Sequence, residues 1–156
     1  MERPGDPIVL QPREGETIDL GNFAMSVKAT GAETGASFTL LEAAEPPHFG
    51  PPMHIHHDCA EAFYVLEGEY LIFIEGAEHR CPAGSFIFIP SGLRHGFRVG
   101  DQPSRKLNLY APAAMLGYFH DLSAAIKRGE GNPDVLDDIA RRYAVEVVGP
   151  VPEGYL

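Results

Sequence analysis

The stretch that decides the fold is His54-Ile55-His56-His57-Asp58-Cys59-Ala60-Glu61. His54 and His56 stand two residues apart, so on a β-strand their side chains lie on the same face. Glu61 follows a short turn-like run and opens a mainly apolar strand. A third histidine, His95, comes after a Pro-Ser-Gly turn and begins another apolar strand. Three imidazoles and one carboxylate form a ligand set suited to a divalent first-row transition metal.

Short apolar or alternating runs continue on both sides of this stretch, separated by turns rich in the 17 glycines and 14 prolines. Many short strands with such turns favour an all-β antiparallel sandwich or barrel. Glu67–Glu69 and Glu75–Ala77 are predicted hairpin connections, and Ile8–Leu10 is a short strand in an N-terminal arm. The predicted strands of the body are Ala24–Thr30, Ser37–Ala43, Met53–His56, Ala62–Glu67, Tyr70–Glu75, Ser85–Ile89, Gly92–Val99 and Arg105–Ala111.

The tail has a helical rather than a strand pattern. Apolar residues recur at helical spacing over 113–127 and again over 134–143, where Asn132-Pro133 provides a cap and a first turn. We expect one domain, with a barrel and arm over 1–111 and helices and tail over 112–156. The helices are expected to pack on the outside of the barrel or to complete a dimer.

Composition excludes several classes of partner. The 156 residues carry a net charge of −10, which disfavours nucleic acid and anionic membranes. No run has the length of a membrane span, and the N-terminus lacks a signal-peptide pattern, so a cytoplasmic location is expected. Cys59 and Cys81 are expected to be free thiols. A thiolate ligand from Cys59 is not expected, because four better-placed ligands exist.

The two halves of the ligand set resemble the two motifs of the cupin superfamily. His54, His56, Glu61 and Gly68 fit the first motif, although His48 stands at its leading glycine position. The second motif is matched by Gly84, Pro90, Gly92 and His95, with Val99 in place of its terminal asparagine. The resemblance implies a double-stranded β-helix, or jelly-roll barrel, with a short C-terminal helical appendage and with the metal motifs in 48–99. It also implies one divalent metal per chain (Fe, Mn, Ni, Co, Cu or Zn), held by His54, His56, Glu61 and His95, and a homodimer.

Within that superfamily, the runs Pro51–His56 and Glu61–Gly68 look like those of quercetin-dioxygenase-type cupins. This resemblance implies that Glu61 is both ligand and catalytic base: a phenolic or enolic substrate loses its proton to Glu61 and is cleaved with O2. The alternative is a non-redox cupin, either a small-molecule binding or sensing protein or a sugar-type isomerase. The fold alone does not choose between them.

Alternation along the strands predicts the substrate pocket. Phe63 and Val65 share the face of Glu61, and Phe97 and Val99 share the face of His95, so these four side chains are expected to surround the metal and to favour an apolar or aromatic substrate. Arg94 and Arg98 alternate with His95 and are expected to face away. An anionic substrate is therefore disfavoured. Four further aromatic residues are assigned to the core: Tyr64, Phe73, Phe86 and Phe88.

Overall fold

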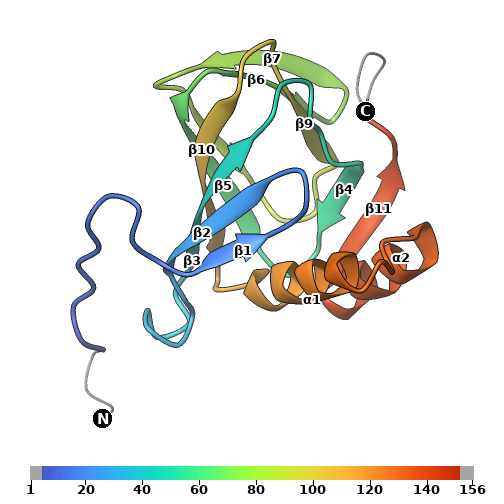
Figure 1. Cartoon of the computed structure of the whole chain (residues 1–156). Coiled ribbons are helices and arrows are strands. Elements are labelled where there is room, and N and C mark those ends of the chain that lie inside the picture. The colour runs from blue at the N-terminus through green and yellow to red at the C-terminus, as the bar shows by residue number, and fades with distance from the viewer. Residues whose placement is uncertain (1–4, 152–156) are drawn as a thin grey trace.

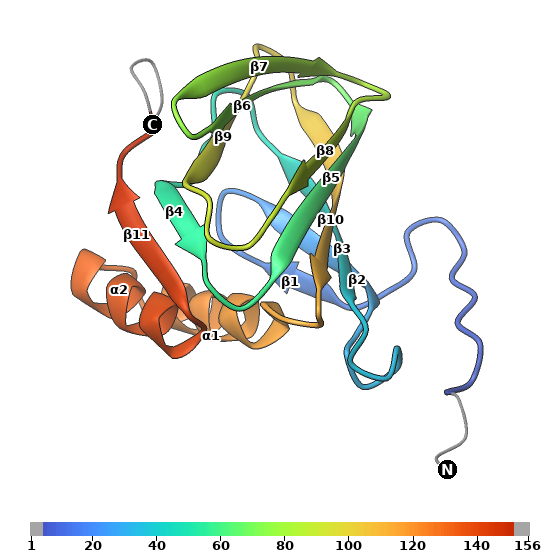
Figure 2. The same cartoon turned by 180° about the vertical axis from the view of Figure 1, so that it is seen from behind.

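The computed structural model describes residues 5–151, which form two antiparallel sheets facing each other with two helices at one end (Figures 1 and 2). The six-stranded sheet has the order β1 (Thr17–Asp19), β2 (Ala24–Ala29), β3 (Thr39–Glu45), β10 (Ser104–Ala111), β5 (Ala60–Glu67) and β8 (Phe86–Ile89). The five-stranded sheet has the order β11 (Val145–Gly149), β4 (Met53–His56), β9 (His95–Val99), β6 (Glu69–Ile74) and β7 (Ala77–Pro82). The helices are α1 (Leu116–Lys127) and α2 (Pro133–Arg142).

The predicted all-β barrel with C-terminal helices is confirmed, and each of the eight predicted body strands overlaps an observed one. Three strands were not predicted: β1, β7 and β11. Strand β7 forms the outer edge of its sheet and buries only Cys81. A strand that exposes both faces carries no alternating hydrophobic signal, so the sequence pattern could not identify it. Conversely, Ile8–Leu10 forms no strand.

One of the two predicted hairpins is wrong. Glu75–Ala77 does turn β6 back onto β7, but the Glu67–Glu69 connection carries the chain from one sheet to the other. Gly68 is required there, because it has a φ of 75° and a Cβ atom would lie 2.0 Å from Ser104 Oγ. The crossover places β5 and β6 on opposite walls of the barrel.

The assignment of four aromatic residues to the core is correct only for Phe73. Tyr64, Phe86 and Phe88 are 45%, 66% and 57% exposed, on the outer face of β5 and β8. Their neighbours along these strands, such as Phe63 and Ile87, are buried. Both faces of these strands carry large apolar side chains, so hydrophobicity alone could not distinguish inside from outside.

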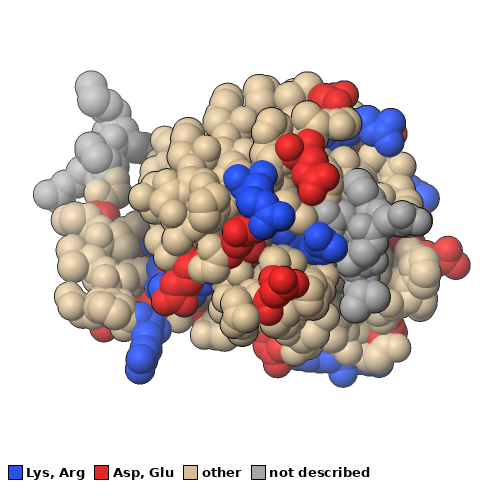
Figure 3. Space-filling view, turned by 90° about the horizontal axis from the view of Figure 1, so that it is seen from above, with Lys and Arg blue, Asp and Glu red and all other residues tan. Residues whose placement is uncertain are grey.

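The helices lie across one end of the barrel, where α1 contacts β1 and α2 contacts β11 (Figure 1). Helix α2 begins at Asn132, whose side chain accepts a hydrogen bond from the Val135 N–H at 3.1 Å, followed by Pro133 at the first position. Of the helices in residues 5–151, neither is long and apolar enough to span a bilayer. At the opposite end, Figure 3 shows acidic and basic side chains interspersed.

Candidate metal centre and its cavity

Strands of both sheets bring the predicted ligands together. Strand β4 supplies His54 and His56, β5 supplies Glu61, and β9 supplies His95, which lies directly opposite His54 in the sheet. One potential ligand atom from each of the four residues lies within 4.8 Å of the others. With metal–ligand distances of about 2.1 Å, ligands on opposite sides of an ion are separated by about 4.2 Å, so the group is close to the size that an ion requires.

The turn before β9 explains how two distant motifs meet. Gly92 has a φ of 91°, which only glycine adopts readily, and its N–H donates to the carbonyl of His56 at 2.9 Å. The Ser91 hydroxyl donates to the same carbonyl at 3.0 Å. These hydrogen bonds attach the start of the second motif to the end of the first, which places His95 beside β4.

Backbone carbonyls set the tautomers of two histidines. His54 Nδ1 lies 2.8 Å from the Pro52 carbonyl, and His95 Nδ1 lies 3.0 Å from the Leu93 carbonyl. A carbonyl only accepts hydrogen bonds, so both Nδ1 atoms carry the proton. In His54 the neutral ring then presents Nε2 as a lone pair, which is the form that binds metals, whereas His95 donates from Nε2 to Glu61 and would give up that proton on binding an ion.

Glu61 lies at the centre of the group and is 4% exposed. Its Oε2 is 2.9 Å from the Nε2 atoms of both His56 and His95. Burial alone would raise the pKa of Glu61, but its contacts with the two imidazoles outweigh burial and hold the pKa well below its usual range. Glu61 is therefore ionised at neutral pH.

The histidines respond in opposite directions. Burial, together with the nearby His95 and His56, lowers the pKa of His54 to about 4, despite the opposing charge of Glu61. Burial would also lower the pKa of His95, but its hydrogen bond to Glu61 outweighs this and raises the pKa. His54 is thus neutral at physiological pH, as a metal ligand must be.

The residues present fit a divalent metal ion. The His56 Nε2 atom is buried and has no hydrogen-bond partner of acceptable geometry, although Glu61 is close. A buried nitrogen without a partner is costly, and coordination of a cation would satisfy it. Nitrogen and carboxylate donors accept any of the metals predicted from the sequence, so the donor set does not select one.

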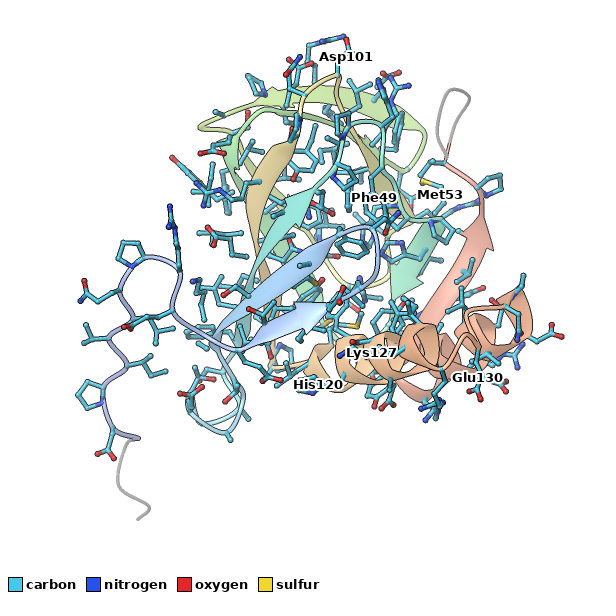
Figure 4. All side chains as sticks on the ribbon, viewed as in Figure 1. Phe49, Met53, Asp101, His120, Lys127 and Glu130 are labelled. Carbon is cyan, nitrogen blue, oxygen red and sulfur yellow. The ribbon has the colours of Figure 1, made fainter. Side chains whose placement is uncertain are left out.

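The group borders a cavity of about 680 Å³. His54, His56 and Glu61 contribute to its lining, and most of the remaining lining is apolar. Phe49, labelled in Figure 4 on the loop before β4, lines the cavity from the barrel side. The helices line it as well, through side chains such as Phe119 of α1 and Leu136 of α2. The C-terminal helices therefore complete the cavity wall, beyond the expected role of covering the outside of the barrel.

The four residues predicted for the pocket occupy different places. Phe97 lines the cavity, as the alternation with His95 indicates. Phe63, Val65 and Val99 are buried in the hydrophobic cluster between the two sheets and are absent from the cavity lining. Val65 and Val99 lie four residues along their strands from Glu61 and His95, where the sheets pack together. Phe63 packs against Lys106 and Phe97.

Tyr110, which the sequence analysis did not single out, contacts the metal centre directly. It lies opposite Glu61 in the sheet, is 2% exposed, and hydrogen-bonds both Glu61 and Asn108. Burial, together with the charge of Glu61, raises the pKa of Tyr110 well above its ordinary value, so the phenol stays protonated and donates to the carboxylate. The signal in the sequence was the alternation along 104–111, where Tyr110 shares a face with Asn108.

Of the lysines and arginines that the structure describes, a single lysine lines the cavity, on β10 rather than in the segment that carries Arg94 and Arg98. Lys106 of β10 is completely buried, and its Nζ lies 3.0 Å from Glu45 Oε1 of β3 and 2.9 Å from Asn108 Oδ1. Lysine is seldom buried, so no sequence pattern predicts that Lys106 lies inside the barrel. Both of its polar partners line the cavity too.

The cysteines are free and buried, as predicted. Cys59 is not part of the group of potential ligands. Burial, followed by the charges of Glu61 and Asp58, raises the pKa of Cys59 to about 11. Its thiol is therefore protonated at neutral pH, the state in which sulfur is a poor ligand.

Two facing antiparallel sheets, with three histidines on adjacent strands of one sheet and a glutamate on the other, define a jelly-roll barrel able to hold a metal ion. The family model described as "Cupin domain" matches residues 41–110, which include all four potential ligands. The chain therefore carries a cupin domain over residues 41–110.

Comparison with individual proteins gives more distant similarities. Quercetin 2,3-dioxygenase of Bacillus subtilis (strain 168) is 28% identical over 99 residues, which are 64% of this chain and 29% of that protein. The chain thus spans less than a third of the length of this curated relative. The polyketide cyclase RemF from Streptomyces resistomycificus is 27% identical with a TM-score of 0.52, over 64% of this chain and 69% of RemF.

A further solved structure shows the fold alone. KdgF from Halomonas sp. has a TM-score of 0.60 at 17% identity, over 69% of this chain and 94% of KdgF. Because these three relatives carry different names, their similarity establishes the barrel without fixing one activity.

Proposed function

We propose that this chain is a metal-dependent dioxygenase that cleaves a small aromatic or enolic substrate with O2. The observation that carries the proposal is the His54, His56, Glu61 and His95 group beside a mainly apolar cavity. The similarity to quercetin 2,3-dioxygenase supports the same substrate class. Bound at these residues, a divalent metal would supply a Lewis acid and a meeting point for substrate and O2.

The protein groups have separate tasks in this proposal. His54, His56 and His95 hold the ion, with two of the rings oriented by the Pro52 and Leu93 carbonyls. Glu61 is ionised, so its Oε2 accepts the proton of a phenol or enol as well as serving as ligand. Tyr110 donates to Glu61 and fixes its orientation. The apolar lining excludes water from the substrate.

A non-redox role is the second candidate, and the similarity to RemF favours it, because that protein is a cyclase by name. In this case the same residues would bind and orient a small molecule without consuming O2. The homodimer, the cytoplasmic location and the single-domain organisation stay predictions from the sequence.

The deciding experiment measures metal content and O2 uptake on the same samples. Protein purified without chelators is analysed for metals, then loaded separately with Fe, Mn, Co, Ni, Cu and Zn. O2 uptake is followed with flavonols, catechols and β-diketones. We expect bound metal and uptake with at least one redox metal, and loss of both in Glu61→Ala.

His79→Ala is the matched control, because His79 lies on the exposed strand β7, away from the cavity. It should retain both properties. Full metal occupancy in Glu61→Ala would contradict the ligand assignment. Bound metal without O2 uptake for any redox metal and substrate class would favour the non-redox candidate.

A further inference from the structure

The inner face of β10 carries polar side chains along its whole length. Ser104, Lys106, Asn108 and Tyr110 alternate inward and are all buried, whereas the outer face carries Arg105, Leu107 and Leu109. Buried polar groups are stable only when they are paired. The contact with Glu61 accounts for the burial of Tyr110. It does not account for the burial of Lys106 and its partners.

The surroundings of Lys106 keep its positive charge inside the barrel. Besides Glu45 and Asn108, Nζ lies over three aromatic rings, with centroids at 4.8 Å in Phe63, 5.3 Å in Tyr70 and 4.3 Å in Phe97. Ring faces attract cations. The pair of Lys106 and Glu45 is neutral overall, so this end of the cavity holds opposite charges without an excess of either.

Glu45 retains an acceptor that the protein does not use. Both of its contacts go to Oε1, from the Tyr70 hydroxyl at 2.8 Å and from Lys106 at 3.0 Å. Among the residues that the structure describes, no hydrogen bond reaches Oε2, although the side chain is only 2% exposed. Because Glu45 lines the cavity, a ligand can supply the missing donor.

The unused acceptor lies away from the metal centre. Tyr110 stands opposite Glu61, and Lys106 stands four residues earlier on the same strand, opposite Ala43 and Val65. Four residues of a strand span about 13 Å. Phe97 lines the cavity and contacts Lys106 through its ring. A flat aromatic molecule bound at the metal can therefore extend toward Glu45.

We propose that Glu45 Oε2 accepts a hydrogen bond from a hydroxyl group at the far end of the substrate, and that Lys106 is the positioning residue that holds this carboxylate in its orientation. The inference rests on the proposed function and names its substrate class: aromatic or enolic molecules with a second, distal hydroxyl. A methyl ether lacks the required donor, and a carboxylate at that position is repelled by Glu45.

The test compares three ligands that share one metal-binding end: 3-hydroxyflavone, 3,4′-dihydroxyflavone and its 4′-methyl ether. Their dissociation constants are measured by calorimetry on the zinc-loaded protein, which does not oxidise them. We expect the 4′-hydroxyl compound to bind about tenfold more tightly than the other two, as for a hydrogen bond to a charged group. Equal affinities in the wild type, or binding of none, would overturn the proposal.

The variant Glu45→Met/Lys106→Met removes both charges together and should abolish the hydroxyl preference. The matched control is Glu42→Met/Arg105→Met, which removes an ion pair from the outer face of the same two strands and should keep the preference. The single variant Lys106→Arg retains the positive charge and should therefore keep the hydroxyl preference. A preference that survives the inner double replacement would refute the role of Glu45.

Two further measurements keep the outcomes separate. If the double variant does not fold, a crystal structure of the wild type with 3,4′-dihydroxyflavone decides whether the hydroxyl lies within hydrogen-bond distance of Glu45 Oε2. Zinc content on the same samples reports the metal centre independently, and O2 uptake by the redox-metal forms reports the reaction. Failure of the dioxygenase proposal is thus distinguishable from failure of the hydroxyl site.

Discussion

Two buried carboxylates, Glu45 and Glu61, face the same cavity, and their negative charges are balanced by different partners. Glu45 is paired with the Lys106 ammonium group and with the Tyr70 hydroxyl. Glu61 has only imidazoles and the Tyr110 phenol around it, and one of those imidazoles, His56, lacks a hydrogen-bond partner of acceptable geometry. The charge of the first carboxylate is balanced within the protein, and only its Oε2 is left for a ligand. The second carboxylate has no such partner, and its group could be completed by a cation.

Breaking the ion pair of Glu45 and Lys106 should have the largest effect on stability. Lys106→Met leaves Glu45 buried without a cation, which is expected to lower the free energy of unfolding by about 3–5 kcal/mol. Adding Glu45→Met should recover most of this loss, because neither charge then remains. Urea denaturation measures both. A double variant as unstable as the single one would show that packing around the lysine stem, and not charge, is responsible.

At the group around Glu61, the stability of the protein should instead depend on bound metal. Zinc at a hundred times its dissociation constant is expected to stabilise the wild type by about 2.7 kcal/mol, because it binds only the folded state. The same gain is expected in Glu45→Met/Lys106→Met and none in His95→Ala. Thermal unfolding with and without zinc gives the comparison. Equal stabilisation of His95→Ala would place the ion elsewhere.

A smaller effect is expected from the hydrogen bond behind the metal centre. Tyr110→Phe removes the donor that orients Glu61 and should weaken zinc binding about tenfold, the lower end of what such supporting contacts contribute. Competition with a chelator measures the affinity. Tyr118→Phe, another residue of the cavity lining, is the control and should change nothing. An unaltered affinity in Tyr110→Phe would mean that the strand alone holds Glu61 in position.

The smallest effect concerns Cys59, which lies beside the metal centre without joining it. Its folded pKa of about 11 exceeds the ordinary value of 9.0, so folding favours the protonated thiol. The resulting stabilisation is complete below pH 9 and is lost as the pH rises from about 9 to about 11. Cys59→Ser should lack this loss, and denaturation curves across that range test it. Zinc content should be unchanged in the variant.

The sequence predicted the metal centre better than the rest of the cavity, and the reason is local. His54, His56 and Glu61 are close in the chain, and the turn before His95 requires a glycine, so spacing alone predicts much of their geometry. The Glu45–Lys106 pair depends on contacts between β3 and β10, which are far apart in sequence. No local pattern shows that two such residues neutralise each other inside a barrel.

The inner face of β10 shows a second limit of sequence patterns. Leu107 and Leu109 would be placed inside by hydrophobicity, but Lys106 and Asn108 occupy the interior. Hydrogen bonds between the inward-facing polar side chains outweigh the usual preference for burying apolar residues. The prediction that Phe86 and Phe88 of β8 lie in the core is wrong for a related reason, because both faces of that strand are apolar in sequence.

Strand β11 has a consequence for how the protein is made. Strand β4, which carries two of the four ligands, has a single paired position with β9 but four with β11. Because β11 follows both helices in the chain, β4 lacks its main neighbour until those helices have left the ribosome. We therefore expect any metal to be captured late in synthesis, because a nascent chain that ends before Val145 presents His54 and His56 on a strand without its main neighbour.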